Sequence, residues 1–142
     1  MPRLDAKIFS HINGTNGFVI TGLPTGDLAQ TATGDFNGDG IDDLAIGISP
    51  DNSAYLILGP LNVTASGSVP LISLIDGVKG FKVSSSNRFD LLGYSVALVD
   101  VNGDSKKDLI VTALTSNPSS TTGYLAVIFG ASGPYSSSLN VN

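Results

Sequence analysis

Residues 35–44 read DFNGDGIDDL, and residues 100–109 read DVNGDSKKDL. In both stretches an oxygen-bearing side chain stands at positions 1, 3, 5 and 9, a glycine stands at position 4, and an apolar segment follows. A hard cation such as Ca²⁺ takes six to eight oxygen ligands, and alternate residues of a tight loop can supply them. Because the pattern occurs twice in matching context, the sequence predicts two metal-binding loops.

Three other loop types share parts of this pattern. Asn-Gly and Asp-Gly hairpin turns would explain the glycines, but they leave three mutually repelling carboxylates within nine residues of each loop unexplained. An EF-hand needs a bidentate Glu at position 12 and flanking helices, whereas position 12 here is Ile46 or Val111, each in a predicted strand. A dockerin pair places similar loops close together on helices, which the 65-residue spacing contradicts.

The acidic residues are unusual in type and in position. All twelve are Asp and none is Glu, and since Glu favours helices more than Asp does, this bias argues against helices. Six of the twelve occupy positions 1, 5 and 9 of the two loops, and setting these six aside leaves six acidic residues against seven basic ones. The acidity is therefore local, and there is no cluster of Lys and Arg of the kind that binds nucleic acid.

Residue types and segments that the sequence lacks limit the kinds of site and the cellular location to be expected. There is no cysteine, so disulfides and thiolate metal sites are excluded. No apolar run reaches the ~20 residues that a membrane span needs, and residues 1–7 lack the apolar run of a signal peptide. Calcium loops suit an extracellular or cell-surface location, where any leader would have been removed or lie outside this sequence. Asn13 and Asn62 begin glycosylation triplets, which also arise often by chance.

The similarity between the two halves extends beyond the loops. Residues 12–19 (INGTNGFV) align with 75–82 (IDGVKGFK) at an offset of 63, the loops align at 65, and residues 56–59 (LILG) align with 127–130 (VIFG) at 71. The offset between matching segments increases along the chain, which indicates strands joined by loops of variable length. A repeat of this size predicts supersecondary units that bury their apolar faces by stacking on neighbours.

The predicted elements are all strands. Short β-branched or aromatic segments are bounded by Gly, Pro, Asn or Ser, and no window has a 3.6-residue period. We therefore expect an all-β chain built from antiparallel, propeller-type blades. The expected strands are residues 7–12, 29–34, 44–48, 55–58, 71–75, 94–99, 109–113 and 124–129.

Residues 34–47 and 92–111 resemble the FG-GAP repeat of integrin α-subunit β-propellers and of many bacterial surface proteins. The resemblance implies a four-stranded blade for each repeat, with a structural Ca²⁺ ion in the loop between its first two strands. The ligands that it implies are the side chains of Asp35, Asn37, Asp39 and Asp43 with the Ile41 carbonyl, and those of Asp100, Asn102, Asp104 and Asp108 with the Lys106 carbonyl.

The sequence departs from the family pattern at positions that pack between blades. The Phe-Gly pair becomes Leu92-Gly93 in the second copy and is lost from the first. Gly-Ala-Pro becomes residues 47–49 (GIS) in one copy and 112–114 (TAL) in the other. We therefore expect an altered blade-to-blade geometry.

The order of segments predicts an incomplete blade. Residues 1–13 would hold an unmatched outer strand, residues 14–76 a first repeat completed by a strand at 71–75, and residues 77–142 a second repeat without its outer strand. A closed propeller has four to eight blades. We expect the N-terminal strand to complete the C-terminal blade of another copy, giving a ring or a fibre. The competing interpretation is an excerpt of a longer propeller.

Catalysis finds little support in the sequence. His11 is the only histidine and lies in a predicted strand, and no Gly-x-Ser-x-Gly elbow occurs. Tyr55 and Tyr124 also fall in predicted strands, where packing is the ordinary role. We expect a non-enzymatic, calcium-binding structural protein that self-associates. The alternatives are a ligand-binding adhesion module, for which Tyr135 and Arg88 are candidate contacts, and an accessory domain of a secreted enzyme.

Overall fold

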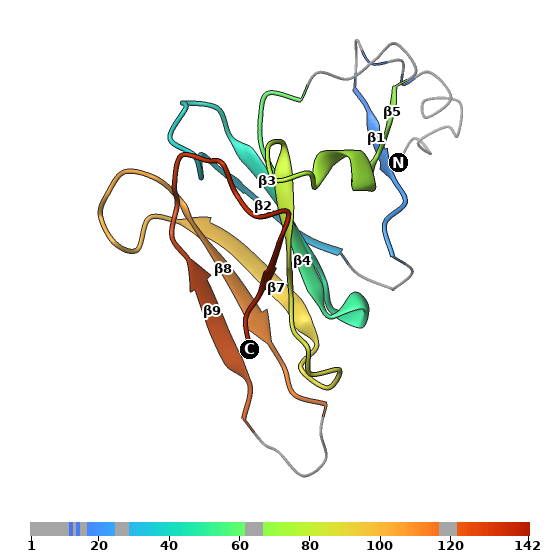
Figure 1. The fold of residues 1–142 in the computed structure, drawn as a ribbon, viewed down its shortest axis with the longest axis vertical. Coiled ribbons are helices and arrows are strands. Elements are labelled where there is room, and N and C mark those ends of the chain that lie inside the picture. Colours follow the sequence, from blue (N-terminus) through green and yellow to red (C-terminus); the bar gives the residue numbers. More distant parts are fainter. Residues whose placement is uncertain (1–11, 13, 15–16, 25–28, 62–66, 117–121) are drawn as a thin grey trace, which may run out of the picture.

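A computed structural model of the protein describes residues 12, 14, 17–24, 29–61, 67–116 and 122–142. The expected all-β class is confirmed: the described residues form strands and two short 3₁₀ helices, with no α-helix among them (Figure 1). The strands are β1 (Val19–Thr21), β2 (Ala29–Gly34), β3 (Asp43–Ile48), β4 (Ser53–Ile57), β5 (Ser68–Pro70), β6 (Gly80–Ser84), β7 (Leu92–Val99), β8 (Asp108–Ala113), β9 (Tyr124–Ile128) and β10 (Ser138–Asn140). The 3₁₀ helices are η2 (Ser49–Asp51) and η3 (Leu71–Leu74).

Two antiparallel sheets carry the repeats. Strands β2, β3, β4 and β6 form the first blade, and β10 adds to the outer edge of β6 in parallel. Strands β7, β8 and β9 form the second blade, whose outer-strand position next to β9 is not filled by any described residue. The central strands of the first blade are covered on both faces, and all five residues of β4 are buried. This explains why β4 has a continuous run of buried residues with no alternation.

The expected strand at residues 71–75 is wrong. Leu71–Leu74 form η3, with Leu71 and Leu74 buried and Ile72 exposed between them. An i, i+3 pair of buried residues fits the three-residue turn of a 3₁₀ helix, and the Ser73 hydroxyl donates to the carbonyl of Pro70 at 2.7 Å. The outer strand of the first blade is instead β6. The other expected outer strand, at 7–12, lies outside the described residues apart from Ile12, which is not in a strand.

β1 is the first-repeat copy of β6, 63 residues earlier in the chain. It pairs in parallel with β5 as β6 pairs in parallel with β10: Val19 lies opposite Ser68, and Lys82 lies opposite Ser138. Each repeat therefore extends a short strand back to the outer strand of the unit before it. The outer-strand role that the sequence suggested for residues 7–12 belongs, among the described residues, to β1.

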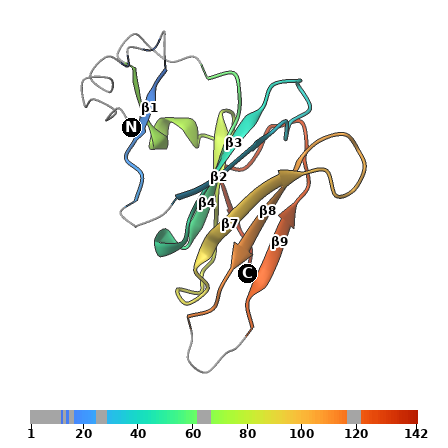
Figure 2. The same cartoon turned by 180° about the vertical axis from the view of Figure 1, so that it is seen from behind.

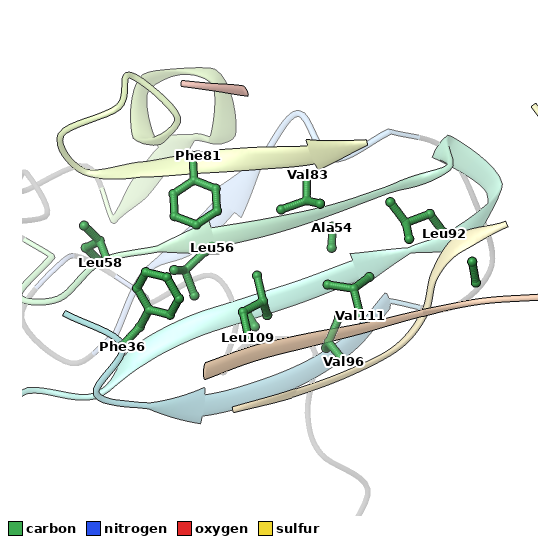
Figure 3. Close-up of a cluster of buried hydrophobic side chains, with 12 residues drawn as sticks. Phe36, Ala54, Leu56, Leu58, Phe81, Val83, Leu92, Val96, Leu109 and Val111 are labelled. Atoms are coloured by element: carbon green, nitrogen blue, oxygen red, sulfur yellow. The ribbon is translucent and has the colours of Figure 1, made fainter. Parts of the chain in front are cut away.

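The main core lies between the two blades (Figure 3). Phe36 and Phe81 of the first blade pack with their ring centroids 5.8 Å apart, and they share one buried cluster with Leu109 and Val111 of β8. Burying each large side chain stabilises the fold by about 1.5–3 kcal/mol. A second cluster covers the opposite face of the first blade, where Ile46 and Ile57 lie beneath η3, β1 and β5.

The altered Phe-Gly pair lies inside the inter-blade contact. Leu92 is fully buried in the main core, and Gly93 has a positive φ of 91°. A side chain at Gly93 would collide with the Ser53 carbonyl, and one at Gly47 would collide with the Gly93 carbonyl. Glycine is therefore required on both sides of this contact because the two backbones approach each other closely.

Two Asp-rich loops as a candidate metal centre

The first loop, residues 35–43, connects β2 to β3 and is held by its own polar side chains. The N–H of Asp39 donates to Asp35 Oδ1 at 3.0 Å and to Asn37 Oδ1 at 2.9 Å, so these two oxygens share one donor and lie close together. The Asp35 carboxylate also accepts from the N–H groups of Gly38 and Gly40, at 2.7 and 2.8 Å. Asp39 in turn accepts from the N–H of Ile41 at 2.8 Å. Three of the predicted ligand side chains are thus brought together.

Asp43, the fourth predicted side-chain ligand, lies at the base of the loop. Its side chain is 1% exposed, and it accepts backbone hydrogen bonds from Phe36 at 2.8 Å and from Gly59 at 2.8 Å. Burial raises the pKa of Asp43 above its ordinary value, although the backbone N–H groups of Gly59, Phe36 and Asn37 act in the opposite direction. Asp43 ties the loop to the end of β4.

The second loop, residues 100–108, reproduces this arrangement between β7 and β8. Asp100 accepts from Gly103 and Ser105, at 2.6 and 2.9 Å. The remaining hydrogen bonds of the loop match those of the first: Asp104 N–H to Asn102 Oδ1 at 3.0 Å, Lys106 N–H to Asp104 Oδ1 at 2.9 Å, Val101 N–H to Asp108 Oδ2 at 2.8 Å, and Gly130 N–H to Asp108 Oδ1 at 2.8 Å. The two loops are therefore alike in geometry as well as in sequence.

The charge of Asp100 is supported by its loop. Desolvation would raise the pKa of Asp100, but the backbone N–H groups of Gly103 and Ser105 outweigh it and hold the pKa below its ordinary value. The nearby Lys107 ammonium acts in the same direction. An ionised carboxylate at position 1 is the form that a cation requires.

The two loops lie side by side across the blade interface. The N–H of Lys107 donates to the carbonyl of Asp35 at 2.8 Å, and the Ser132 hydroxyl donates to the carbonyl of Asn37 at 3.1 Å. A side chain at Gly38 would meet the Lys106 side chain at 3.1 Å. Sequence reasoning placed each loop in its own blade but gave no sign of this contact.

The donor set fits a hard cation in chemistry. Each loop brings two carboxylates and one carboxamide together, and a carboxylate oxygen that accepts one N–H still has a second lone pair for a cation. No group of three or more His, Cys, Asp or Glu side chains within metal-binding distance occurs among the described residues. Asp43 and Asp108 are buried at the base of their loops. Ile41 and Lys106 contribute backbone N–H groups within their loops.

Sequence reasoning missed two features, one beside the loops and one at the opposite end of the second blade. Gly59 and Gly130 each donate an N–H to the buried Asp of their repeat, and their only sequence signal is a shared apolar-apolar-Gly ending. Asp90 is 5% exposed and accepts from Ser85 Oγ at 2.5 Å and from Tyr124 OH at 2.8 Å. Tyr124, expected only to pack, thus also anchors β9.

The described fold and its loops define an all-β protein of repeated, propeller-type blades with an Asp-rich turn at the start of each blade. The FG-GAP repeat family model matches residues 29–70 and 92–128, and the chain belongs to that family. These ranges cover the first three strands of each blade and both loops.

Two curated relatives are integrin alpha proteins. The chain is 40% identical over 82 residues to integrin alpha pat-2 of Caenorhabditis elegans, and 37% identical over 81 residues to integrin alpha pat-2 of Caenorhabditis briggsae. The matches cover 58% and 57% of this chain but only 6% of either relative. The chain thus corresponds to a small part of each relative's length. No helix among the described residues has the length and apolar character that a bilayer crossing requires.

Proposed function

We propose that this protein is a non-enzymatic, calcium-binding structural module of the cell surface or extracellular space. The observation that carries the proposal is the pair of loops with the same hydrogen-bond pattern, in which two carboxylates and a carboxamide converge. Asp35, Asn37 and Asp39 would hold one Ca²⁺ ion and Asp100, Asn102 and Asp104 a second, with the Ile41 and Lys106 carbonyls and the buried Asp43 and Asp108 completing each site.

A bound calcium ion would offset the mutual repulsion of the carboxylates in each loop. The loop residues would keep the turn closed through their backbone hydrogen bonds, and the buried Asp of each repeat would fix the loop to the strand after it. Because the second loop contacts the first through Lys107 and Asp35, a rigid turn in one blade also supports the position of the next. We therefore infer a structural role for the metal.

Isothermal titration with CaCl₂ tests the metal directly. We expect two sites in the unmodified chain, and the loss of one site in Asp39→Asn and of the other in Asp104→Asn. Asp42→Asn is the matched control, since Asp42 belongs to the same loop, is exposed and is outside the proposed ligand set. Calcium binding that is absent, or that falls equally in Asp42→Asn and Asp39→Asn, would contradict the proposal.

We also propose that the protein associates with other copies of itself, head to tail. The support is the second blade, which lacks an outer strand among the described residues, together with β1, an outer strand whose own blade is not among them. Sedimentation velocity in calcium and in chelator tests this. We expect assemblies in calcium that dissociate on chelation, and a calcium-loaded monomer at all concentrations would refute self-association.

A ligand-binding adhesion module is the second candidate, favoured by the similarity to integrin alpha proteins over both repeats. Of the two predicted contact residues, Arg88 lies over the ring of Phe89, 4.7 Å from its centroid, while Tyr135 packs against Phe36 and Phe81 in the core. Arg88 is exposed and remains available to a ligand, whereas Tyr135 is mainly a packing residue. Retention of this chain on immobilised matrix proteins, compared with Arg88→Ala, tests the candidate.

A further inference from the structure

The outward face of the second blade is an apolar surface whose counterpart in the first blade is covered. Ala54, Leu56 and Leu58 of the first blade are 0%, 0% and 8% exposed because the second blade packs on them. Their copies 71 residues later, listed in the same order, are Leu125, Val127 and Phe129, which are 55%, 40% and 60% exposed. The outward face of the second blade is thus equivalent to the face of the first blade on which the second blade packs. The repeat therefore predicts that another blade packs on it.

β1 is an outer strand of which only one edge pairs with another described strand. Its copy β6 pairs with β4 on one side and with β10 on the other, whereas β1 pairs among the described residues with β5 alone. The same contrast appears in the side chains: Phe81 is fully buried, and its copy Phe18 is 37% exposed. Among the described residues β1 thus lacks a neighbour equivalent to β4, and β9 is a strand of that kind whose second edge pairs with no described strand.

A pocket beside β1 identifies a third element of the contact. It has a volume of about 330 Å³, and Phe18, Leu44, Ile57 and Gly59 contribute to its wall. The copies of these four residues in the next unit are Phe81, Leu109, Ile128 and Gly130, all of which belong to or border the core around Phe36. The pocket is therefore the equivalent, one unit earlier, of the position that Phe36 fills between the two blades. The copy of Phe36 in the second repeat is Val101, which is 51% exposed.

We propose that the second blade of one copy packs against the first blade of a second copy, whose strand β1 becomes the outer strand next to β9. This specifies the self-association proposed above and rests on it. The register follows from the pairing of β4 with β6, in which Tyr55 lies opposite Lys82 and Ala54 opposite Val83. Across the two copies, Ala126 of one lies opposite Val19 of the other, and Leu125 lies opposite Ile20.

The remaining contacts repeat those between the two blades. Val101 of one copy enters the pocket beside Phe18 of the other. The carbonyl of Asp100 accepts from the N–H of Asp42, as the carbonyl of Asp35 accepts from Lys107 within the chain. Because β1 and β9 lie at opposite ends of the molecule (Figure 2), one copy cannot make this contact with itself. The contact is heterologous, so successive copies form a ring or a filament.

Cysteine cross-linking tests the register without background, since the chain has no cysteine. An equimolar mixture of Val19→Cys and Ala126→Cys should give a disulfide-linked dimer under mild oxidation in calcium. The double variant Val19→Cys/Ala126→Cys should give a ladder of covalent oligomers. The control is Val19→Cys/Val127→Cys, in which the second cysteine points to the other face of the sheet because side chains alternate along a strand. A ladder that is absent, or equal in the two double variants, overturns the proposal.

A charge placed in the outward face provides an independent test. Val127→Lys should weaken self-association at least about tenfold, since an ammonium would be buried in an apolar contact. Val78→Lys, a valine 73% exposed in the turn before β6, is the matched control and should leave association unchanged. Equal effects of the two substitutions would contradict the proposed surface.

The calcium titration separates failure of this inference from failure of the proposed function. Two calcium sites in a chain that forms no ladder would refute the docking surface alone. A ladder in the predicted register from a chain that binds no calcium would refute the metal sites and leave the docking surface standing. A stable complex formed only with a different protein would also refute the second copy as occupant.

Discussion

Asp108 is fully buried and accepts a hydrogen bond from the N–H of Gly130, 22 residues further along the chain, at 2.8 Å. This bond joins the start of β8 to Gly130, two residues beyond the end of β9. Asp43 and Gly59 form the same pair in the first repeat. In each blade a buried carboxylate that accepts at least two backbone hydrogen bonds therefore links the loop to the end of the third strand.

Replacing this buried carboxylate should destabilise the fold. In Asp108→Asn one carboxylate oxygen becomes an NH₂ group facing a backbone donor, so we expect a loss of about 1–3 kcal/mol in the free energy of unfolding. Chemical denaturation in excess chelator measures it. Asp104→Asn, in the exposed part of the loop, is the control and should change stability by less than about 0.5 kcal/mol in chelator. Equal losses in the two variants would show that Asp108 has no special structural role.

The sixth position of each loop offers a backbone test. Gly40 and Ser105 have positive φ values of 85° and 74°, and only glycine adopts this region without strain. Ser105→Gly should therefore increase the free energy of unfolding by about 1 kcal/mol and raise the melting temperature. The reverse change, Gly40→Ser, should lower it by a similar amount, since a Cβ at Gly40 meets nothing within 4 Å and the cost is conformational. Shifts of the same sign in both variants would contradict this account.

The pair of Phe18 and Phe81 separates folding from association. Phe81→Ala removes a fully buried ring and should lower the unfolding free energy by about 3 kcal/mol or more. Phe18→Ala, at the equivalent but half-exposed position, should cost the monomer much less. It should instead weaken self-association, because Phe18 borders the pocket proposed to receive a second copy. Denaturation and sedimentation of the same two variants measure both quantities, and a Phe18→Ala chain that associates normally would count against the pocket.

Asp51 gives stability a defined dependence on pH. Burial would raise its pKa, but hydrogen bonds from Tyr55 OH at 2.7 Å and Lys82 Nζ at 3.2 Å outweigh this effect and leave the pKa lowered. A carboxyl with a lowered folded-state pKa stabilises the fold above its unfolded value of ~3.9 and loses that contribution as the pH falls through the folded value.

Asp51→Asn should therefore be less stable than the unmodified chain at pH 7, by about 1 kcal/mol. The difference should shrink at pH values below ~4. Thermal melts of both chains across this range, in chelator, measure it. A difference that grows on acidification would show that the sign is wrong.

The sequence predicted the parts of the fold that local chemistry specifies. The two loops could be recognised because ligand-type residues at fixed positions recur at one offset, and β3 and β8 because an apolar run follows each loop directly. Residues 71–75 could not be assigned correctly, since the run LISLI fits a buried strand and a 3₁₀ turn equally well, and only the burial of Leu71 and Leu74 on one side decides between them.

The long-range features left little trace in the sequence. The parallel pairing of β10 with β6 joins residues that are far apart, and its three residues have no distinctive pattern. The N–H groups of Gly59 and Gly130 were missed as partners of the buried Asp residues because a backbone donor leaves no signature in side-chain type. The contact between the two loops likewise depends on how the blades stack, which no single repeat encodes.

Strands β5 and β10 each pair with a strand that is synthesised earlier, so the order of synthesis affects the order in which the sheets are completed. Because residues 138–140 cover the outer edge of β6, the first blade cannot finish its sheet until those residues have left the ribosome. Synthesis at about 5–20 residues per second delays that step by several seconds after β6 itself has emerged. Each unit is thus closed by its successor, and the newest part of a growing chain always carries an open edge.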